Sequence, residues 1–374
     1  MKKLLYFFSA LTIVFISISA GLNRTSDTAD LTANFSVGDP AIASINAMSF
    51  GPEGILFIGD SQKAAIYALD TQDKARKEKG GEIRIEKFDE KIAAALGTTV
   101  ATIKITDMAV NPLSKMPYFS ISTMDGTPVL LRLNGESLEN VSLKEVRYSE
   151  IKIDQPIGED VVDKRNRPQR VWSISDLKYH NGKVMVSGLS NKEFASTFRS
   201  IPFPFEDNQI AASLEIWHAA HGAFETHAPI KTFDVIQLEG VDYLMASYTC
   251  TPLVLFPMDE LKDGVHKKGR TVAELGAGNS PLDMISYEKE GKQYFLMSNT
   301  NRPVMRFDYS DIANFKETLM EPVEEFAVAT GVPYDNLPFP HVLQMDLLDK
   351  ENVVYVQRTA SGEVLLRSRS TKWM

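Results

Sequence analysis

A pattern of short apolar strands separated by polar turns recurs along the whole chain. In each copy, an apolar strand that starts at a polar residue is followed by a turn, a second apolar strand, a short polar cluster and a third strand. The copies begin at Asn46, Asp107, Asp176, Asp234, Asp283 and His341. A strand repeat of about 50 to 70 residues is typical of β-propeller blades, which leave few strand edges exposed. The sequence therefore predicts an all-β protein, a single β-propeller with six blades, or seven as the alternative.

Segments between the repeats predict the parts that complete the propeller. We expect additional strands at residues 32–37, 144–148, 225–231 and 271–275. The first of these would close the ring by adding to the last blade. Two insertions flank the third repeat, one at residues 154–170 and one at residues 191–208. Long loops on a rigid scaffold often carry binding residues, and we expect both insertions at the mouth that carries the Asp residues.

The first repeat resembles the blade unit of a known class of propellers. Its residues are Ile45-Asn-Ala-Met-Ser-Phe-Gly-Pro-Glu-Gly-Ile-Leu-Phe-Ile-Gly-Asp-Ser61, followed by Ala65-Ile-Tyr-Ala-Leu-Asp70. This segment is similar to the blades of six-bladed propellers of the NHL and gluconolactonase (TolB-like) type, and the other repeats match only as a pattern. The resemblance implies the fold alone, because many activities share this architecture. It supplies no set of catalytic residues.

The N-terminus has the features of a secretion signal. Lys2 and Lys3 precede an apolar stretch from Leu4 to Ile18, and small residues follow it. This pattern predicts a signal peptide at residues 1–20, a propeller domain at residues 21–374, and a periplasmic or secreted protein. An uncleaved membrane anchor is the alternative. Cys250 is the only cysteine, so the fold has no intramolecular disulfide.

Composition limits the partners of the chain. It has 49 acidic and 40 basic residues, for a net charge of −9. A general nucleic-acid binder needs a basic surface to displace counterions from phosphates, so we expect no nucleic-acid partner. No segment after the signal is apolar for long enough to cross a bilayer, so we expect no membrane contact after cleavage.

The polar residues that open the innermost strands predict a ring around one mouth of the central channel. The second strand of each blade runs back antiparallel, so its polar end lies at the same mouth. We therefore predict a ligand-binding mouth that contains Asn46, Asp107, Asp176, Asp234, Asp283, His341, Asn299 and Arg358.

The carboxylates of this mouth have two interpretations. Asp107, Asp176, Asp234 and Asp283 could bind a hard cation, Ca²⁺ before Mg²⁺, because oxygen ligands suit both ions. Carboxylates in such a ring repel one another unless a cation, a proton or a basic ligand lies among them. The favoured interpretation is structural: each Asp accepts hydrogen bonds from backbone N–H groups in its own turn. The cofactor therefore stays unknown, with Ca²⁺ as the candidate.

A histidine cluster between residues 217 and 227 is the second candidate site. His218, His221 and His227 are three of the six histidines of the chain, and Glu225 lies among them. Imidazole binds Zn²⁺ and Cu²⁺, so this cluster is the alternative metal site. If residues 214–218 form a third strand, the cluster lies on the face opposite the Asp residues. A structural or solvent-exposed group of histidines is the favoured interpretation.

Three functions follow from these features. The preferred one is an exported binding or scaffold protein that recognises a small molecule or a protein partner at the Asp-lined mouth. The second is a metal-dependent hydrolase of the lactonase or esterase kind. The third is a periplasmic redox or metal-handling partner that uses the histidine cluster and Cys250. The sequence contains no G-x-S-x-G elbow, phosphate loop or dinucleotide motif, so whether the protein is an enzyme and its oligomeric state stay open.

Overall fold

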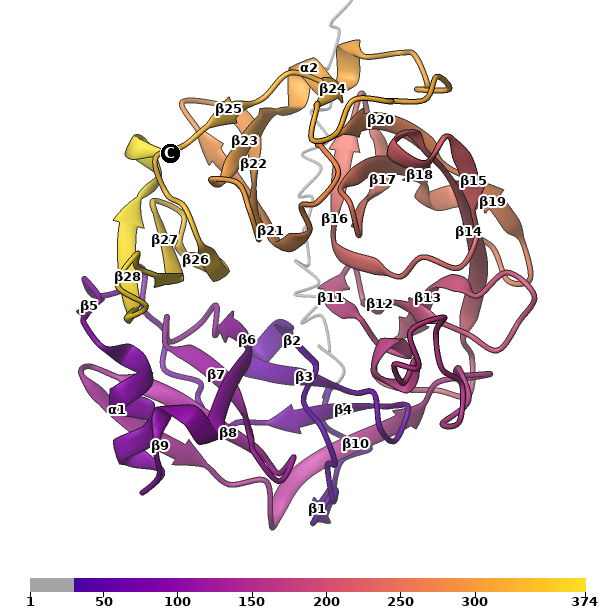
Figure 1. Ribbon diagram of the computed structural model, residues 1–374. Coiled ribbons are helices and arrows are strands. Elements are labelled where there is room, and N and C mark those ends of the chain that lie inside the picture. Colours follow the sequence, from indigo (N-terminus) through magenta and orange to yellow (C-terminus); the bar gives the residue numbers. More distant parts are fainter. Residues whose placement is uncertain (1–29) are drawn as a thin grey trace, which may run out of the picture. The chain divides into compact units, whose positions relative to one another are not determined.

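The computed structural model describes residues 30–374, and Thr32–Met374 form one compact unit. Six sheets, antiparallel except for the parallel pairing of one short outer strand in blade 3, are arranged in this unit as a ring of blades (Figure 1). The prediction of a single all-β propeller with six blades is confirmed. The predicted signal peptide at residues 1–20 lies outside the described residues.

Each blade is described from its innermost strand outwards. Blade 1 contains β2 (Ala47–Phe50), β3 (Ile55–Asp60), β4 (Ala65–Asp70), β10 (Val146–Lys152) and β1 (Ser36–Gly38). Blade 2 contains β6 (Ile103–Val110), β7 (Pro117–Thr123), β8 (Pro128–Asn134) and β9 (Ser137–Val141). Blade 3 contains β11 (Asp176–His180), β12 (Lys183–Leu189), β13 (Ser196–Pro202) and β14 (Ile210–His218), with β15 (Ala223–Glu225) and β19 (His266–Lys268) paired to β14.

The remaining blades follow the same plan. Blade 4 contains β16 (Ile230–Leu238), β17 (Val241–Tyr248), β18 (Pro252–Pro257), β20 (Arg270–Glu274) and β24 (Thr330–Gly331). Blade 5 contains β21 (Pro281–Lys289), β22 (Lys292–Asn299), β23 (Met305–Asp308) and β25 (Asp335–Asn336). Blade 6 contains β26 (Val342–Asp349), β27 (Asn352–Arg358), β28 (Val364–Ser370) and β5 (Arg84–Ile85).

The chain does not visit the blades in their order around the ring. The innermost strand of blade 1, β2, packs against β6 of blade 2 on one side and β11 of blade 3 on the other, and β6 also packs against β26 of blade 6. Blade 2 therefore lies between blades 1 and 6 (Figure 1). After blade 2 the chain returns along β10, which joins blade 1, and only then enters blade 3. The expected strand at residues 144–148 thus belongs mainly to blade 1.

This order explains how the ring closes. We expected residues 32–37 to add a strand to the last blade, and that expectation is wrong: β1 pairs with β10 in blade 1. Blade 6 is completed instead by β5, which pairs with β28. Because blade 2 is the neighbour of blade 6, the segment that leads into blade 2 passes the outer edge of blade 6.

The expected insertion at residues 191–208 contains a strand that the sequence analysis missed. This strand is β13, the third strand of blade 3, and it pairs with β12 and β14 over most of its length. Its Ser196, Thr197 and Arg199 are polar yet buried, which hid the apolar pattern of a strand. Residues 214–218 therefore belong to the fourth strand. The chain after them emerges at the opposite face from the one expected, because each antiparallel strand reverses direction.

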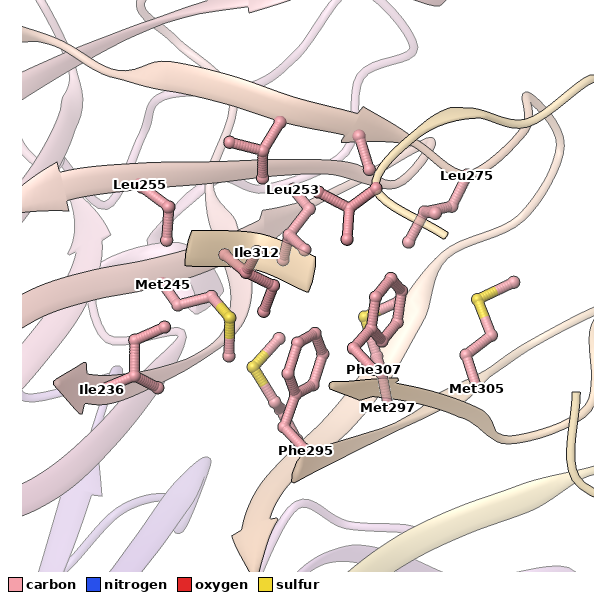
Figure 2. Packing of buried hydrophobic residues seen from close by; sticks show 14 of the residues in the cluster. Ile236, Met245, Leu253, Leu255, Leu275, Phe295, Met297, Met305, Phe307 and Ile312 are labelled. Atoms are coloured by element: carbon pink, nitrogen blue, oxygen red, sulfur yellow. The ribbon is translucent and has the colours of Figure 1, made fainter. Parts of the chain in front are cut away.

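The hydrophobic core lies between neighbouring blades. Figure 2 shows the contact between blades 4 and 5, where Met245 and Leu255 face Phe295 and Phe307. The rings of Phe295 and Phe307 stack with centroids 4.3 Å apart. Ile312, from helix α2 (Tyr309–Asn314), packs into the same cluster. Each fully buried side chain of this kind contributes about 1.5–3 kcal/mol, so blade contacts are the main source of stability.

Helices are few and lie outside the blades. Helix α1 (Phe88–Ala95) packs Phe88 and Ile92 onto the core between blades 2 and 6. Within residues 30–374, no helix has both the length and the apolar character that crossing a bilayer requires.

Candidate functional site

The innermost strands of blades 2, 3 and 5 each carry an Asp that hydrogen-bonds to the neighbouring blade. The backbone N–H groups of Met48, Phe233 and Met345 donate to Asp107, Asp176 and Asp283 at 2.6, 3.1 and 2.8 Å, respectively. In all three, the other carboxylate oxygen accepts the N–H of the following residue at 2.8 Å. These side chains therefore hold both their own strand and the next blade.

The alternating blades 1, 4 and 6 carry a second tier of side chains with the same role. Ser49 accepts from the backbone N–H of Tyr179 at 3.3 Å, and Asp346 accepts from that of Val110 at 2.7 Å. Asp234 accepts from the hydroxyl of Ser286. The six side chains link every blade to the next in a closed circuit, which we call the channel belt. Hydrogen bonds to charged groups contribute about 1.5–3 kcal/mol each, so the belt helps to close the ring.

In blade 6 the belt residue is Asp346. The prediction placed His341 there because it opens the strand, but His341 is exposed and its backbone carbonyl accepts from the N–H of Arg358. Asp346 lies five residues further along the chain, within β26, and accepts the hydrogen bond that joins blade 6 to blade 2.

A lysine lies among these carboxylates. Lys178, two residues after Asp176 on β11, donates from Nζ to the carbonyl of Met284 in blade 5 at 2.9 Å. Burial alone would lower the pKa of Lys178, but the carboxylates around it, with Asp234 and Asp176 foremost, raise the pKa above its ordinary value. The cation that the sequence analysis required among the Asp residues is therefore a side chain of the chain itself.

One lysine carries a single positive charge and does not neutralise the five carboxylates of the belt. Protons bound to these carboxyl groups compensate part of the remaining negative charge. Burial raises the pKa of Asp176 to about 6 and the pKa of Asp283 to about 7. Burial, together with repulsion from Asp283 and Asp176, also raises the pKa of Asp107 well above its usual range. Some of these carboxyl groups are therefore protonated near neutral pH.

Two cavities meet the belt from opposite faces of the ring. The larger has a volume of about 640 Å³ and opens where the innermost strands begin. The smaller has a volume of about 380 Å³ and opens where they end. Asp107, Asp176 and Asp283 border both cavities, so they form a shared floor.

Cations and an aromatic ring line the wall of the larger cavity. Lys104, Lys231 and Arg358 border it, and the Nζ of Lys231 lies 4.2 Å from the centroid of the Trp172 ring. Val171 and Trp172, which also border the cavity, directly follow the predicted insertion at residues 154–170. Burial and the nearby charge of Lys104 lower the pKa of Lys231. The cavity thus combines a carboxyl floor with a positively charged wall.

The residues predicted for the ligand-binding mouth do not all lie there. Asn46 and Arg358 border the larger cavity, along with Asp107, Asp176 and Asp283. Asp234 belongs to the second tier and His341 lies outside the cavity lining. Asn299 is buried, and its amide donates to the carbonyls of Met297 and Pro303 at 3.1 and 3.3 Å, so it braces a turn of blade 5.

The sequence analysis missed Lys178, Lys231 and Trp172. Lys178 could have been recognised in the sequence, because it is a charged residue within an apolar innermost strand. It directly precedes Tyr179, so the two side chains point to opposite faces of the strand. Lys231 is the second residue of β16, three residues before Asp234 on the same strand. Trp172 had no signal in the sequence, since only the path of the long loop brings it to the mouth.

The belt is not a preformed cage for Ca²⁺. Among residues 30–374, the carboxylates of Asp107, Asp176, Asp234 and Asp283 do not form a group of potential ligands, whereas His218, His221 and Cys250 do. We call these three residues the His–Cys cluster; their potential ligand atoms lie within 4.8 Å of one another. The carboxylates are separated because each reaches sideways to its own neighbouring blade.

A short connection between β14 and β15 builds the His–Cys cluster. His218 ends β14, His221 ends the 3₁₀ turn Ala219–His221, and Gly222 reverses the chain at φ 58° into β15. This reversal brings Glu225 back to both histidines, with Nδ1···O distances of 2.8 Å for His218 and 2.5 Å for His221. Burial opposes ionisation of Glu225, but the hydrogen bonds from His218 and His221 lower its pKa.

Cys250 reaches the histidines from blade 4. It lies in the turn between β17 and β18, where Cys250 and Thr251 adopt left-handed backbone at φ 64° and 66°. This turn lies at the face where the larger cavity opens, so the prediction that the histidines lie on the opposite face is wrong. The missed strand β13 is the reason. His227 is not part of the cluster, and its Nδ1 lies 2.9 Å from the hydroxyl of Thr226.

Comparisons with known proteins identify no family for this chain. No protein-family model matches it, and no curated protein matches it. A structure of the mitotic checkpoint complex covers 98% of both chains at 9% identity and a TM-score of 0.31. Drosophila plexin A in complex with semaphorin 1b covers 90% of this chain and 86% of its own at 10% identity and a TM-score of 0.36. The GH43 endo-arabinanase from Bacillus licheniformis covers 71% and 92% at 12% identity and a TM-score of 0.36. At these scores the likenesses carry no argument about function.

Proposed function

We propose that this protein is an exported binding propeller that receives a small polar molecule in the larger cavity. The observation that carries the proposal is the opposition of charge within one concave site: carboxyl groups of the channel belt at the floor, and Lys104, Lys231 and Arg358 on the wall. A volume of about 640 Å³ lies within the range of small-molecule sites. The propeller fold is consistent with a binding or scaffold role, and the N-terminal pattern supports export.

The charges indicate the chemistry of the ligand. An anionic group, such as a carboxylate, would pair with Lys231 and Lys104. An ammonium or hydroxyl group at the other end would donate to Asp107 or Asp283, and Trp172 would cover an apolar part. We therefore propose a zwitterionic or hydroxyl-rich acid as the ligand. A deep cavity suits such a molecule better than the surface of a protein partner.

The hydrolase hypothesis receives less support. Its metal would need several belt carboxylates at one point, and each is instead engaged with a neighbouring blade. The similarity of the first repeat to the NHL and gluconolactonase type supports kinship among propellers but adds no catalytic residue.

Thermal unfolding with a panel of amino acids, dipeptides, dicarboxylates and polyamines tests the proposal. A zwitterion should raise the melting temperature, because a ligand that binds only the folded state stabilises it. Lys231→Met should abolish this increase, while Lys292→Met, a change of an exposed lysine on β22, should keep it. If polyamines alone stabilise the protein and Lys231→Met binds them equally well, the floor binds cations and the proposed role of the wall is wrong.

A further inference from the structure

The His–Cys cluster has the ligand types of a transition-metal site. Two imidazoles and one thiolate are borderline to soft ligands, which favour Zn²⁺ or copper over Ca²⁺ and Mg²⁺. Their potential ligand atoms, within 4.8 Å of one another, come from two blades, from β14 and the turn after it and from the β17–β18 turn. The ring itself therefore brings the three residues together.

Glu225 arranges both imidazoles in the manner of a metal centre. Its two oxygens take the Nδ1 atoms of His218 and His221, so the Nε2 atom of each ring remains for a metal ion. Ligating histidines commonly donate their other ring N–H to a carboxylate, which fixes the tautomer and strengthens the ligand. One carboxylate thus holds two histidine rings whose centroids lie 3.9 Å apart.

Unpaired buried atoms belong to His218 and to its neighbour Glu274. His218 is 1% exposed, and its Nε2 has no hydrogen-bond partner among the described residues. Glu274 is fully buried, its Oε1 likewise lacks a partner, and its other oxygen lies 3.8 Å from His218 Nε2. Leaving such groups unpaired is costly, and a cation bound at His218 Nε2 would satisfy that atom and lie near the Glu274 carboxylate.

We propose that His218 Nε2, His221 Nε2 and Cys250 Sγ bind one Zn²⁺, with Glu225 as the carboxylate that positions both histidines. Three protein ligands leave a fourth position open to water or to an exogenous ligand, and buried Glu274 borders the site. This site is separate from the larger cavity, so its existence does not depend on the ligand proposed there.

Metal binding to the full-length protein tests the assignment. The protein is freed of metal with a chelator and titrated with Zn²⁺ by calorimetry, and with Co²⁺ by absorption spectroscopy. We expect one ion per chain and a thiolate-to-cobalt charge-transfer band. Cys250→Ser should remove the band. Glu225→Gln should weaken Zn²⁺ binding by about 10- to 100-fold, because it disturbs both ligands without removing either.

Two further variants distinguish the loss of a metal ligand from the loss of a nearby histidine or of the fold. His227→Ala removes a nearby histidine outside the cluster and should leave affinity unchanged. His221 is half-exposed, so His221→Ala provides a ligand deletion that should not disturb folding if Cys250→Ser proves unstable. The proposal is overturned if the wild type binds no stoichiometric metal ion, or if Cys250→Ser and His221→Ala bind it as tightly as His227→Ala does.

Discussion

The channel belt and the His–Cys cluster are built from similar polar side chains, yet their atoms are satisfied in different ways. In the belt, every carboxylate accepts hydrogen bonds from its own strand or a neighbouring blade, and Lys178 lies among the carboxylates. At the His–Cys cluster, the Nε2 of His218 and one oxygen of the neighbouring Glu274 are buried with no hydrogen-bond partner among residues 30–374. The belt carboxylates thus have partners within the protein, whereas these two atoms do not.

This difference separates side chains that join neighbouring blades from a cluster suited to a metal ion. Both regions contain residues that sequence patterns associate with metals, and residue type alone does not distinguish them. The direction of the side chains does: belt carboxylates accept hydrogen bonds from the next blade. His218 ends β14, and His221 and Cys250 lie in turns, so these residues converge outside the repeated innermost strands.

The largest expected effect comes from removing the cation of the belt. Lys178→Met would leave the carboxylates around it without their charge partner, and removing one member of a buried ion pair costs about 3–5 kcal/mol. Urea-induced unfolding near pH 8 measures the loss. Lys292→Met is the control and should change the free energy of unfolding by less than about 0.5 kcal/mol. If both variants are equally stable, Lys178 does not neutralise the belt.

Lowering the pH should stabilise the protein through the belt, whereas the Lys178→Met substitution should destabilise it. Because burial raises the pKa of Asp176 to about 6 and of Asp283 to about 7, the folded protein binds more protons than the unfolded chain between pH 4 and 7. The free energy of unfolding should therefore fall as the pH rises from about 5 to 8. We expect a decrease of about 2–4 kcal/mol, at about 1.4 kcal/mol per pKa unit and with allowance for water in the cavities.

Urea-induced unfolding at a series of pH values tests this expectation, and Asp283→Asn should flatten the profile. Stability that is constant or that increases over this interval would show that the carboxyl groups remain ionised. Lys178→Met should steepen the profile, since the remaining carboxylates then repel one another without compensation.

The sequence was sufficient for the class of fold and for four of the five belt carboxylates. The repeat predicts them because each blade needs an acceptor on its innermost strand, and Asp107, Asp176, Asp234 and Asp283 lie near the start of apolar strands. It failed at His341, because the acceptor of blade 6 is Asp346, which lies within β26 and not at the residue that opens the repeat. The repeat also could not predict that blade 2 lies between blades 1 and 6, because similar units carry no information on which blades are neighbours in the ring.

The prediction of where the candidate metal site lies depended on the number of strands assigned to blade 3. One buried polar strand, β13, escaped detection, and that omission placed His218 on the wrong face and away from Cys250. The residues of the cluster were visible individually, but His227 was taken as the third ligand because it is near in sequence. Cys250 is near only in space, through the contact between blades 3 and 4.

The smallest expected effect is the change in stability caused by His221→Ala, and it distinguishes the His–Cys cluster from the channel belt most clearly. His221 is half-exposed, so in the presence of a chelator His221→Ala should change the free energy of unfolding by less than about 1 kcal/mol. With Zn²⁺ added, the wild type should gain stability and His221→Ala should not, because only an ion that binds the folded state stabilises it. Thermal unfolding with chelator and with Zn²⁺, alongside His227→Ala, measures both differences. A large loss of stability in chelator would instead make His221 a structural residue like those of the belt, and the contrast between the two regions would disappear.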